Sequence, residues 1–366
     1  MSQEVSYSLH EYVKLSNLTL SDLESIRLIL RGGSIIDWKR LNFKTAEEIN
    51  RFLRTNGYDP TDKEDIRRLI LLKNRALQYL EGTFKYEFPK NLRTMNDIHR
   101  LFLNASNWRE YNRLQVFSCM VLKVMNIINH IDGRALLGYI DVTPNDLTNY
   151  VTDTIYSRLK KMQESGLPIV AYSGGEKSKS SMVTKLLSKQ ESIASQIFDR
   201  VRFRVITEKQ EDVLPMLSYL KDEFIAVNYV IPGQSVNNLL NYIDTLKKNV
   251  RLKPHIKDLQ TDIGIEDEIR IKDFQERRKL NVFSADTYHV INFVFDMPLR
   301  MTEFSPKFKD FRHDEFGNII FSLIEIQVVD QMTDTKNQEG EASHERYKQR
   351  QIDRVWYRLV RGLKEI

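Results

Sequence analysis

The hydrophobic pattern changes near Gly166, and this change limits the folds open to the chain. From about Leu18 to Lys161, apolar residues recur at intervals of three and four, as in helices with one buried face. After Gly166, short runs rich in Val, Ile and Phe alternate with helical stretches, a mixture typical of an α+β fold. The sequence therefore predicts an N-terminal all-helical domain over residues 1–166. It predicts an α+β domain over residues 167–366, with a mixed β-sheet flanked by helices.

Start and stop signals divide the first half into separate helices. A Ser or Thr before an apolar-periodic run is a common N-cap, and a Gly after the run commonly ends the helix. Ser21 and Thr143 are predicted to cap two helices. Thr45 is predicted to cap a third, with Glu48 completing a capping box. The run 111–131 is the most apolar and is expected at the centre of the bundle.

The second half contains five runs with strand-like composition. A strongly charged stretch, residues 239–286, interrupts them and is predicted to be a partly helical insertion at one edge of the sheet. The predicted strands are residues 167–175, 201–207, 224–232, 288–298 and 318–329.

Composition excludes several classes of protein. The only cysteine, Cys119, lies in an apolar run, which rules out a disulfide framework or a cysteine zinc cluster and predicts a buried, inert thiol. The first residues lack the pattern of a secretory signal. No apolar run approaches the roughly 18 residues of a membrane span, so we expect a cytoplasmic protein without a membrane partner. A net charge of +5 permits nucleotides or RNA as partners.

Two predicted strands carry charged or polar faces. In the run 201–207, Arg202 and Arg204 alternate with apolar residues, and Arg200 precedes them on the same face. In the run 318–329, Glu325 and Gln327 share one side. These faces could line one cleft, or they could be solvated faces of the sheet.

Six short motifs follow one another in the order found in a known enzyme family. Each is weak alone, but their collinearity over residues 175–348 resembles the synthetase domain of RelA/SpoT-type alarmone synthetases. The matching residues are Lys177, Ser181 and Lys185, then Asp199 and Arg204, then Pro232 and Gly233, then Tyr288, Ile291 and Asn292, then Glu325, Ile326 and Gln327, and finally Gly340, Ala342, His344, Tyr347 and Lys348.

The resemblance implies transfer of pyrophosphate from ATP to the 3′ hydroxyl of a guanine nucleotide or of an RNA such as tRNA. It assigns Lys177 and Lys185 to the donor's phosphates. Asp199 and Glu325 would be the catalytic carboxylates and would hold Mg²⁺, and Glu325 would also help to deprotonate the acceptor hydroxyl. Tyr288 would stack on the acceptor base. The remaining nucleotide-binding residues would be Ser181, Arg204, Asn292, Gln327, His344 and Lys348.

Ordinary structural roles remain open for several of these residues. Lys177 and Lys185 could be solvated helix lysines, and Glu325 could pair with one of the arginines. Tyr288 could pack in the core or at an edge. His344 could be a surface histidine, and Asp199 could cap its strand.

Some positions depart from the family pattern. Gly175, Gln234 and Val329 stand where the family has arginines, and Asn292 stands where it has a histidine. Neutral groups do not replace charge-assisted contacts, so the chain could instead be an inactive relative that senses a nucleotide. A third possibility is an RNA-binding or protein-binding module that uses the basic segment 251–279. The first half lacks the adjacent His-Asp ligands of the family's hydrolase domain.

Overall fold

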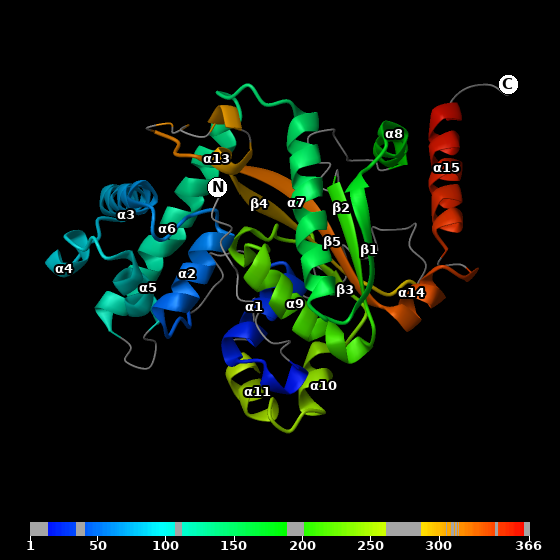
Figure 1. The fold of residues 1–366 in the computed structure, drawn as a ribbon, viewed down its shortest axis with the longest axis horizontal. Helices are drawn as coiled ribbons and strands as arrows, with labels where there is room; N and C mark the ends of the chain where they lie inside the picture. Colours follow the sequence, from blue (N-terminus) through cyan, green and yellow to red (C-terminus); the bar gives the residue numbers. More distant parts are fainter. Residues whose placement is uncertain are drawn as a thin grey trace.

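A computed structural model of the chain shows an α+β fold in which a mixed sheet is flanked by helices, as predicted (Figure 1). The strands cross the middle of the molecule, and helices lie on both sides of them. The structure describes residues 14–33, 41–106, 112–188, 201–260, 287–304, 306–308, 311, 313, 315–340 and 343–361.

The sheet has five strands in the order β1-β2-β5-β4-β3. Only β2 and β5 run parallel, and the other neighbours are antiparallel. The two longest strands, β4 and β5, therefore lie inside the sheet. The bounds are β1 (Ile169–Glu176), β2 (Val201–Thr207), β3 (Val236–Asn237), β4 (Ile291–Arg300) and β5 (Ile319–Asp330).

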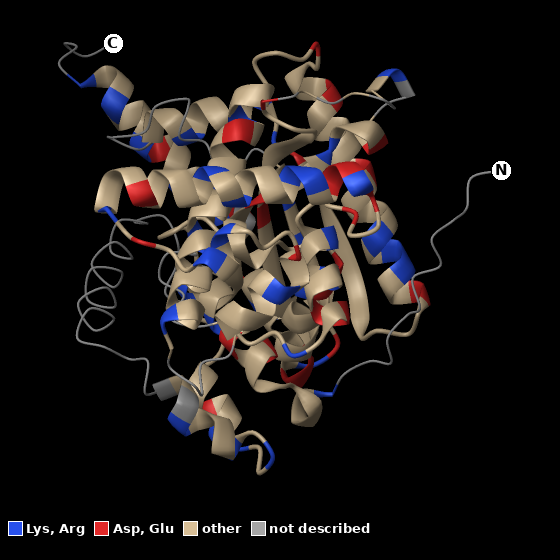
Figure 2. Cartoon of the chain, turned by 90° about the vertical axis from the view of Figure 1, so that its left-hand side faces the viewer, with Lys and Arg blue, Asp and Glu red and all other residues tan. Residues whose placement is uncertain are grey.

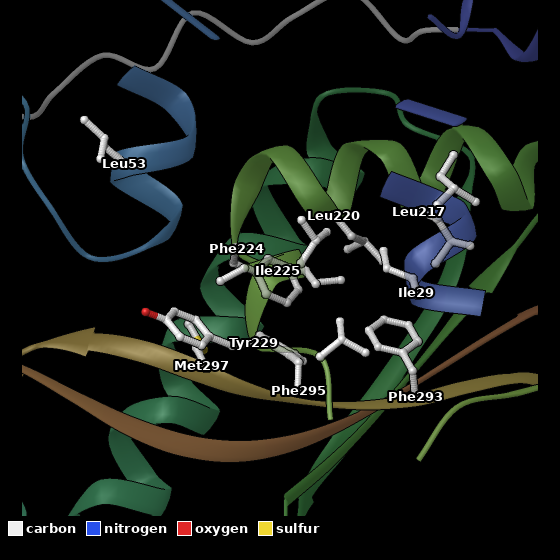
Figure 3. Close-up of a cluster of buried hydrophobic side chains, with 14 of the residues drawn as sticks. Ile29, Leu53, Leu217, Leu220, Phe224, Ile225, Tyr229, Phe293, Phe295 and Met297 are labelled. Atoms are coloured by element: carbon white, nitrogen blue, oxygen red, sulfur yellow. The ribbon is translucent and has the colours of Figure 1, made fainter. Parts of the chain in front are cut away.

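One face of the sheet forms the apolar core. Phe293 and Phe295 of β4 are fully buried and point toward Leu217 and Leu220 of α9 (Val213–Glu223), as Figure 3 shows. The helices α1 (Leu20–Arg31) and α7 (Pro144–Glu164) also cover this face; Ile29 of α1 joins the cluster, and Tyr156 of α7 packs on Phe203. The alternation of apolar residues in β2, β4 and β5 is what directs them to this side.

The opposite face is divided between a helix and the candidate site. The helix α6 (Arg113–Leu136) covers the end of the sheet where β5 begins, and its Gly133 lies against Phe321. A Cβ on Gly133 would come within 2.4 Å of that ring, so only glycine allows this close approach. The other end carries polar side chains. Figure 1 shows α8 (Lys179–Ser188) and α15 (His344–Val360) on the side of β1 and β2, and α14 (Gln331–Asn337) at the end of β5.

The remaining helices surround α6 or flank α1. Both α3 and α5 pack on α6, and α10 and α11 form the described part of the predicted insertion. Seen from the side of α3 and α4, acidic and basic residues are interspersed rather than gathered in one patch (Figure 2). The bounds of these remaining helices are α2 (Ala46–Thr55), α3 (Lys63–Phe84), α4 (Lys90–Arg93), α5 (Ile98–Ser106), α10 (Tyr242–Lys247), α11 (Lys253–Gln260) and α13 (Met301–Phe304).

The helix caps confirm part of the sequence-based prediction. Thr143 caps α7 in a capping box with Asp146, and Thr45 caps α2 by accepting a hydrogen bond from the backbone of Glu48. The predicted capping box at Thr45 was wrong, because the Glu48 carboxylate accepts from the backbone N–H of Lys44 instead. The prediction for α1 was wrong, because Thr19 rather than Ser21 is its N-cap. Thr19 is the cap because two hydrogen bonds join it to Asp22, three residues later. The Thr19 hydroxyl accepts from the backbone N–H of Asp22, and the Asp22 carboxylate accepts from the backbone N–H of Thr19.

Four of the five predicted strands are confirmed, but the run 224–232 is not a strand. Residues Val227–Tyr229 form a 3-10 turn, and of this run only Val230 bridges to β4. The turn brings two polar side chains onto α6: Asn228 donates to Asn126, and the Tyr229 hydroxyl accepts a bond from Asn129. Buried polar groups need such partners, and they outweigh the strand-like composition of this run.

The helix α6 is the only one in the described part of the chain that is long and apolar enough to cross a membrane by length and composition. The expectation that no run approaches that length was therefore wrong. In this structure α6 is a core helix, packed by α3, α5 and β5, and core helices share this composition. Its Cys119 is buried, and burial raises the pKa of the thiol, as expected of an inert cysteine.

Candidate functional site

The register of the sheet places the polar residues of three strands in two neighbouring rows. In one row Arg202 of β2 pairs with Glu325 of β5. In the next row Arg204 pairs with Gln327, which in turn pairs with Asn292 of β4. Because side chains two residues apart in a strand share a face, all five lie on the same side of the sheet.

Glu325 is held by two cations. Its Oε2 accepts a hydrogen bond from Nε of Arg202 at 2.6 Å, and its Oε1 accepts one from Nη2 of the same arginine at 3.1 Å. The Nζ of Lys177 lies 3.8 Å from Oε2. The glutamate is only 4% exposed, so this ion pair is largely withdrawn from water while its cations reach the surface.

Arg204 organises the second row. Its Nη1 donates to the Tyr288 hydroxyl at 2.9 Å and to Oε1 of Gln327 at 3.2 Å, and its Nη2 lies 2.5 Å from Oδ1 of Asp334. The guanidinium also lies 6.0 Å from the centre of the Tyr288 ring. Asp334, on α14, was not predicted as a site residue. It fixes the arginine that in turn positions the tyrosine.

The backbone around Tyr288 is also fixed. Asn238 donates to the Tyr288 carbonyl, and Asn337 both donates to and accepts from the backbone of His289. A ring anchored in this way loses little conformational entropy when a ligand stacks on it.

Asn292 completes the second row with an unused acceptor. Its Oδ1 is buried and has no hydrogen-bond partner in the described part of the structure. A buried acceptor without a partner is destabilising by about 1–3 kcal/mol. A ligand that donated a hydrogen bond there would remove this penalty.

The helix α8 begins beside this cluster. The Ser178 hydroxyl caps it by accepting from the Ser181 backbone at 3.3 Å. Ser181 and Lys185 lie one turn apart on α8, whereas Lys348 is exposed on α15, which packs on α8. The structure therefore places these three residues on helices beside the two rows, not within them.

Two predicted site residues cannot be placed by their side chains. Asp199 lies outside the described residues. His344 is the first residue of α15, but its side chain lies outside the described part of the structure.

The positions that depart from the family pattern have physical explanations. Gly175 has a φ of 133°, a conformation that L side chains rarely adopt, so an arginine there would be strained. Val329 is fully buried on the side of the strand that carries Gln327. Gln234 closes a turn by donating its backbone N–H to Ile231.

A separate cleft of about 330 Å³ lies between α1, α2 and α9, away from the polar rows. Lys221 is one of its lining residues, and the Nζ of this lysine lies 3.0 Å from Asp22 and 2.8 Å from Asp222. The volume of this cleft favours it as a ligand site, but the chemistry of its lining residues does not. The buried lysine already has two carboxylate partners, and the rings that line the cleft, Phe43 and Phe52, pack on each other and on Phe102.

Comparisons with known proteins return solved structures of the family that the motifs indicated. The chain is similar to small alarmone synthetase 2 from Bacillus subtilis, with 14% identity over 59% of this chain and 94% of that one, at a TM-score of 0.29. It is also similar to a GTP pyrophosphokinase family protein from Streptococcus pneumoniae, with 13% identity, 58% and 84% coverage and a TM-score of 0.30.

A third similar structure is small alarmone synthetase 1 from Bacillus subtilis bound to its product pppGpp, with 11% identity, 64% and 88% coverage and a TM-score of 0.28. Because these TM-scores are well below 0.5, they support neither a residue correspondence nor a function. No protein-family model matches the chain, and no curated protein matches it by sequence.

Proposed function

We propose that the polar rows form the nucleotide site of a cytoplasmic pyrophosphotransferase. The enzyme would transfer pyrophosphate from ATP to the 3′ hydroxyl of a guanine nucleotide or of an RNA such as tRNA. The observation that carries this proposal is the convergence of Lys177, Arg204, Tyr288, Glu325 and Gln327. These residues come from well-separated segments, and the motifs of the sequence had assigned all five to one site.

The chemistry of the polar rows suits a nucleotide with a polyphosphate chain. Lys177, Arg202 and Arg204 supply positive charge for phosphate oxygens. The anchored ring of Tyr288 offers a surface on which a base can stack, and the unused Oδ1 of Asn292 can accept a hydrogen bond from an amino or imino group.

In the proposed reaction, the 3′ oxygen of the acceptor forms a bond to the β-phosphorus of ATP. The bond from that phosphorus to the α,β-bridging oxygen breaks, and AMP leaves. The hydroxyl proton passes to a carboxylate, the role assigned to Glu325. Mg²⁺ carried on the phosphates of ATP would neutralise charge that develops during transfer.

The experiment is incubation of the protein with labelled ATP, Mg²⁺ and either GDP, GTP or tRNA, followed by separation of the products. We expect a labelled acceptor from the wild type and at least a hundredfold slower transfer by the Glu325→Gln variant. Lys161→Met, an exposed change on α7, serves as the matched control and should act within about twofold of wild type. Absence of transfer to every acceptor would contradict the proposal.

One observation favours a second candidate, an inactive relative that senses a nucleotide. Both carboxylate oxygens of Glu325 are already bonded to Arg202, and Gly175, Gln234 and Val329 bring no charge to the cleft. A protein that binds a non-hydrolysable ATP analogue but transfers no label would be this second candidate. The third possibility, RNA binding by residues 251–279, falls mainly outside the described residues.

A further inference from the structure

Of the two carboxylates that the family resemblance assigns to Mg²⁺, Glu325 is the one that the structure describes. Mg²⁺ needs oxygen ligands at about 2.0–2.1 Å in near-octahedral geometry. Both oxygens of Glu325 instead face nitrogen donors, at 2.6 Å and 3.1 Å from Arg202 and 3.8 Å from Lys177. Within the described residues, no three His, Cys, Asp or Glu side chains gather as a metal site. The donor set at Glu325 therefore does not fit Mg²⁺.

The Arg202–Glu325 pair is built into the sheet. The two residues are partners in the parallel register of β2 and β5, and Arg202 is flanked on its other side by Gly175 of β1. Through Nε and Nη2, Arg202 forms a bidentate ion pair with the carboxylate. Bidentate, charge-assisted pairs are stronger than hydrogen bonds between neutral groups. A metal ion at Glu325 would have to displace a guanidinium that the backbone holds in place.

Among the described residues, the charged groups at the two rows favour an anion over a second cation. They are three cations, Lys177, Arg202 and Arg204, and two anions, Glu325 and Asp334. Arg202 keeps 35% of its side chain exposed and Lys177 keeps 20%. A guanidinium has five N–H donors, so one arginine can bond a carboxylate and a phosphate oxygen together.

We propose that Arg202 takes the place of the metal ion on Glu325, and that the polar rows bind a polyphosphate through Arg202 and Lys177 without a metal held by Glu325. This inference rests on the proposed function, which supplies the polyphosphate ligand. It deepens that function by naming Arg202 as the residue that substitutes for the metal at the protein side of the site. Any Mg²⁺ would then enter and leave with the nucleotide.

The first test titrates Mn²⁺ into protein without nucleotide, with free Mn²⁺ measured by electron paramagnetic resonance. We expect no Glu325-dependent site in the wild type. Arg202→Gln frees the carboxylate and should tighten Mn²⁺ binding by at least about tenfold, and Arg202→Gln/Glu325→Gln should abolish that gain. The double variant removes both charges of the pair and so leaves no unpaired buried charge. A wild-type Mn²⁺ site that Glu325→Gln removes would overturn the proposal.

The second test uses inorganic tripolyphosphate in calorimetry, once in excess Mg²⁺ and once in EDTA. The wild type should bind it in EDTA within about threefold of its affinity in Mg²⁺, and Arg202→Gln should lose at least about tenfold. Arg67→Gln, an exposed change on α3, is the matched control and should leave binding unchanged. Binding that requires Mg²⁺, or that survives unchanged in Arg202→Gln, would overturn the proposal.

The two tests also separate this proposal from the proposed function. If the wild type binds no tripolyphosphate in either buffer, the nucleotide site itself is refuted. The Mn²⁺ titration then still decides whether Arg202 excludes a metal from Glu325.

Discussion

Two buried carboxylates on the same face of the sheet have similar partners but different surroundings. Asp296 of β4 pairs with His130 and Arg134 of α6, and Glu325 of β5 pairs with Arg202 and Lys177. Both carboxylates are almost completely buried, and each is bound by two cationic side chains, counting His130 as cationic when it is protonated.

The difference lies in what surrounds each pair. His130 packs between the rings of Phe321 and Tyr229, with centroid distances of 4.7 and 5.2 Å, so the first pair locks α6 to the sheet. The second pair adjoins a row of polar groups made by Arg204, Gln327 and Asn292. The first pair thus joins two elements inside apolar rings, whereas the second pair borders the proposed nucleotide site.

The largest expected effect comes from removal of the enclosed pair. Asp296→Ala leaves two cationic groups without their acceptor and should lower the free energy of unfolding by about 3 kcal/mol, measured by urea denaturation. Asp141→Ala, at a fully exposed side chain 3.8 Å from Lys307, is the control and should change it by less than about 0.5 kcal/mol. A loss below about 1 kcal/mol for Asp296→Ala would show that this pair does not hold α6 on the sheet.

The matching change at the second pair should lower the rate of pyrophosphate transfer more than it lowers the stability of the fold. Glu325→Gln should lower the free energy of unfolding by about 1–2 kcal/mol, less than Asp296→Ala, because Arg202 can turn to water. Tripolyphosphate affinity should be kept or rise, since the guanidinium loses its competing carboxylate. Equal loss of stability in the two variants would erase the distinction between the pairs.

Substitutions of Tyr288 test whether a nucleotide base stacks on this ring beside the polar rows. Tyr288→Ala should weaken binding of a guanine nucleotide by roughly ten- to hundredfold, since stacking contributes about 1–3 kcal/mol. Tyr288→Phe keeps the ring, loses one hydrogen bond to Arg204, and should weaken binding by about fivefold or less. Tripolyphosphate has no base, so neither variant should change its affinity. Calorimetry on both ligands separates stacking from a folding defect.

The smallest effect is expected at the carboxylate–lysine cluster on the other side of the sheet. Burial alone would raise the pKa of Asp22, but the charge of Lys221 and the hydrogen bonds from Thr19 lower it below 3.8. Its contribution to stability is therefore present above pH 3.8 and is lost as the pH falls through the lowered pKa. Asp22→Asn should cost about 1 kcal/mol at pH 7.

Urea denaturation at several pH values checks this expectation. The difference between wild type and Asp22→Asn should shrink as the pH falls below 3.8 and the wild-type carboxyl is protonated. A difference that stays constant down to pH 2 would show that the carboxylate charge contributes nothing and that only the cap bond matters.

Much of the fold follows from local sequence. Strands β2, β4 and β5 have alternating or continuous apolar runs, and Thr143 and Thr45 carry local capping signals, so periodicity and caps were sufficient to predict them. The run 224–232 shows where this fails. Its turn is stabilised by Asn228 and Tyr229 bonding to α6, a helix about 100 residues earlier in the chain, and no local pattern contains that contact.

The motifs named some of the residues that the structure brings together, but not how these residues pair. The ordered motifs identified Lys177, Arg204, Glu325 and Gln327, and the structure brings these four together. The pairing of Glu325 with Arg202 depends on the parallel register of β2 and β5, whose paired residues lie 123 positions apart. The contribution of Asp334 was missed because α14 is short and polar. The Asp330 cap four residues earlier was the only local signal that α14 begins there.

The proposed function requires that a nucleotide bind at the polar rows through Lys177 and Tyr288. It is tested most directly by calorimetry with a non-hydrolysable ATP analogue on the wild type, on Lys177→Met/Tyr288→Ala, and on Lys161→Met/Tyr79→Ala as the exposed control. We predict one site per chain in the wild type and the control, and at least about tenfold weaker binding in the first variant. Equal affinity in all three proteins, or no binding by the wild type, would contradict the account.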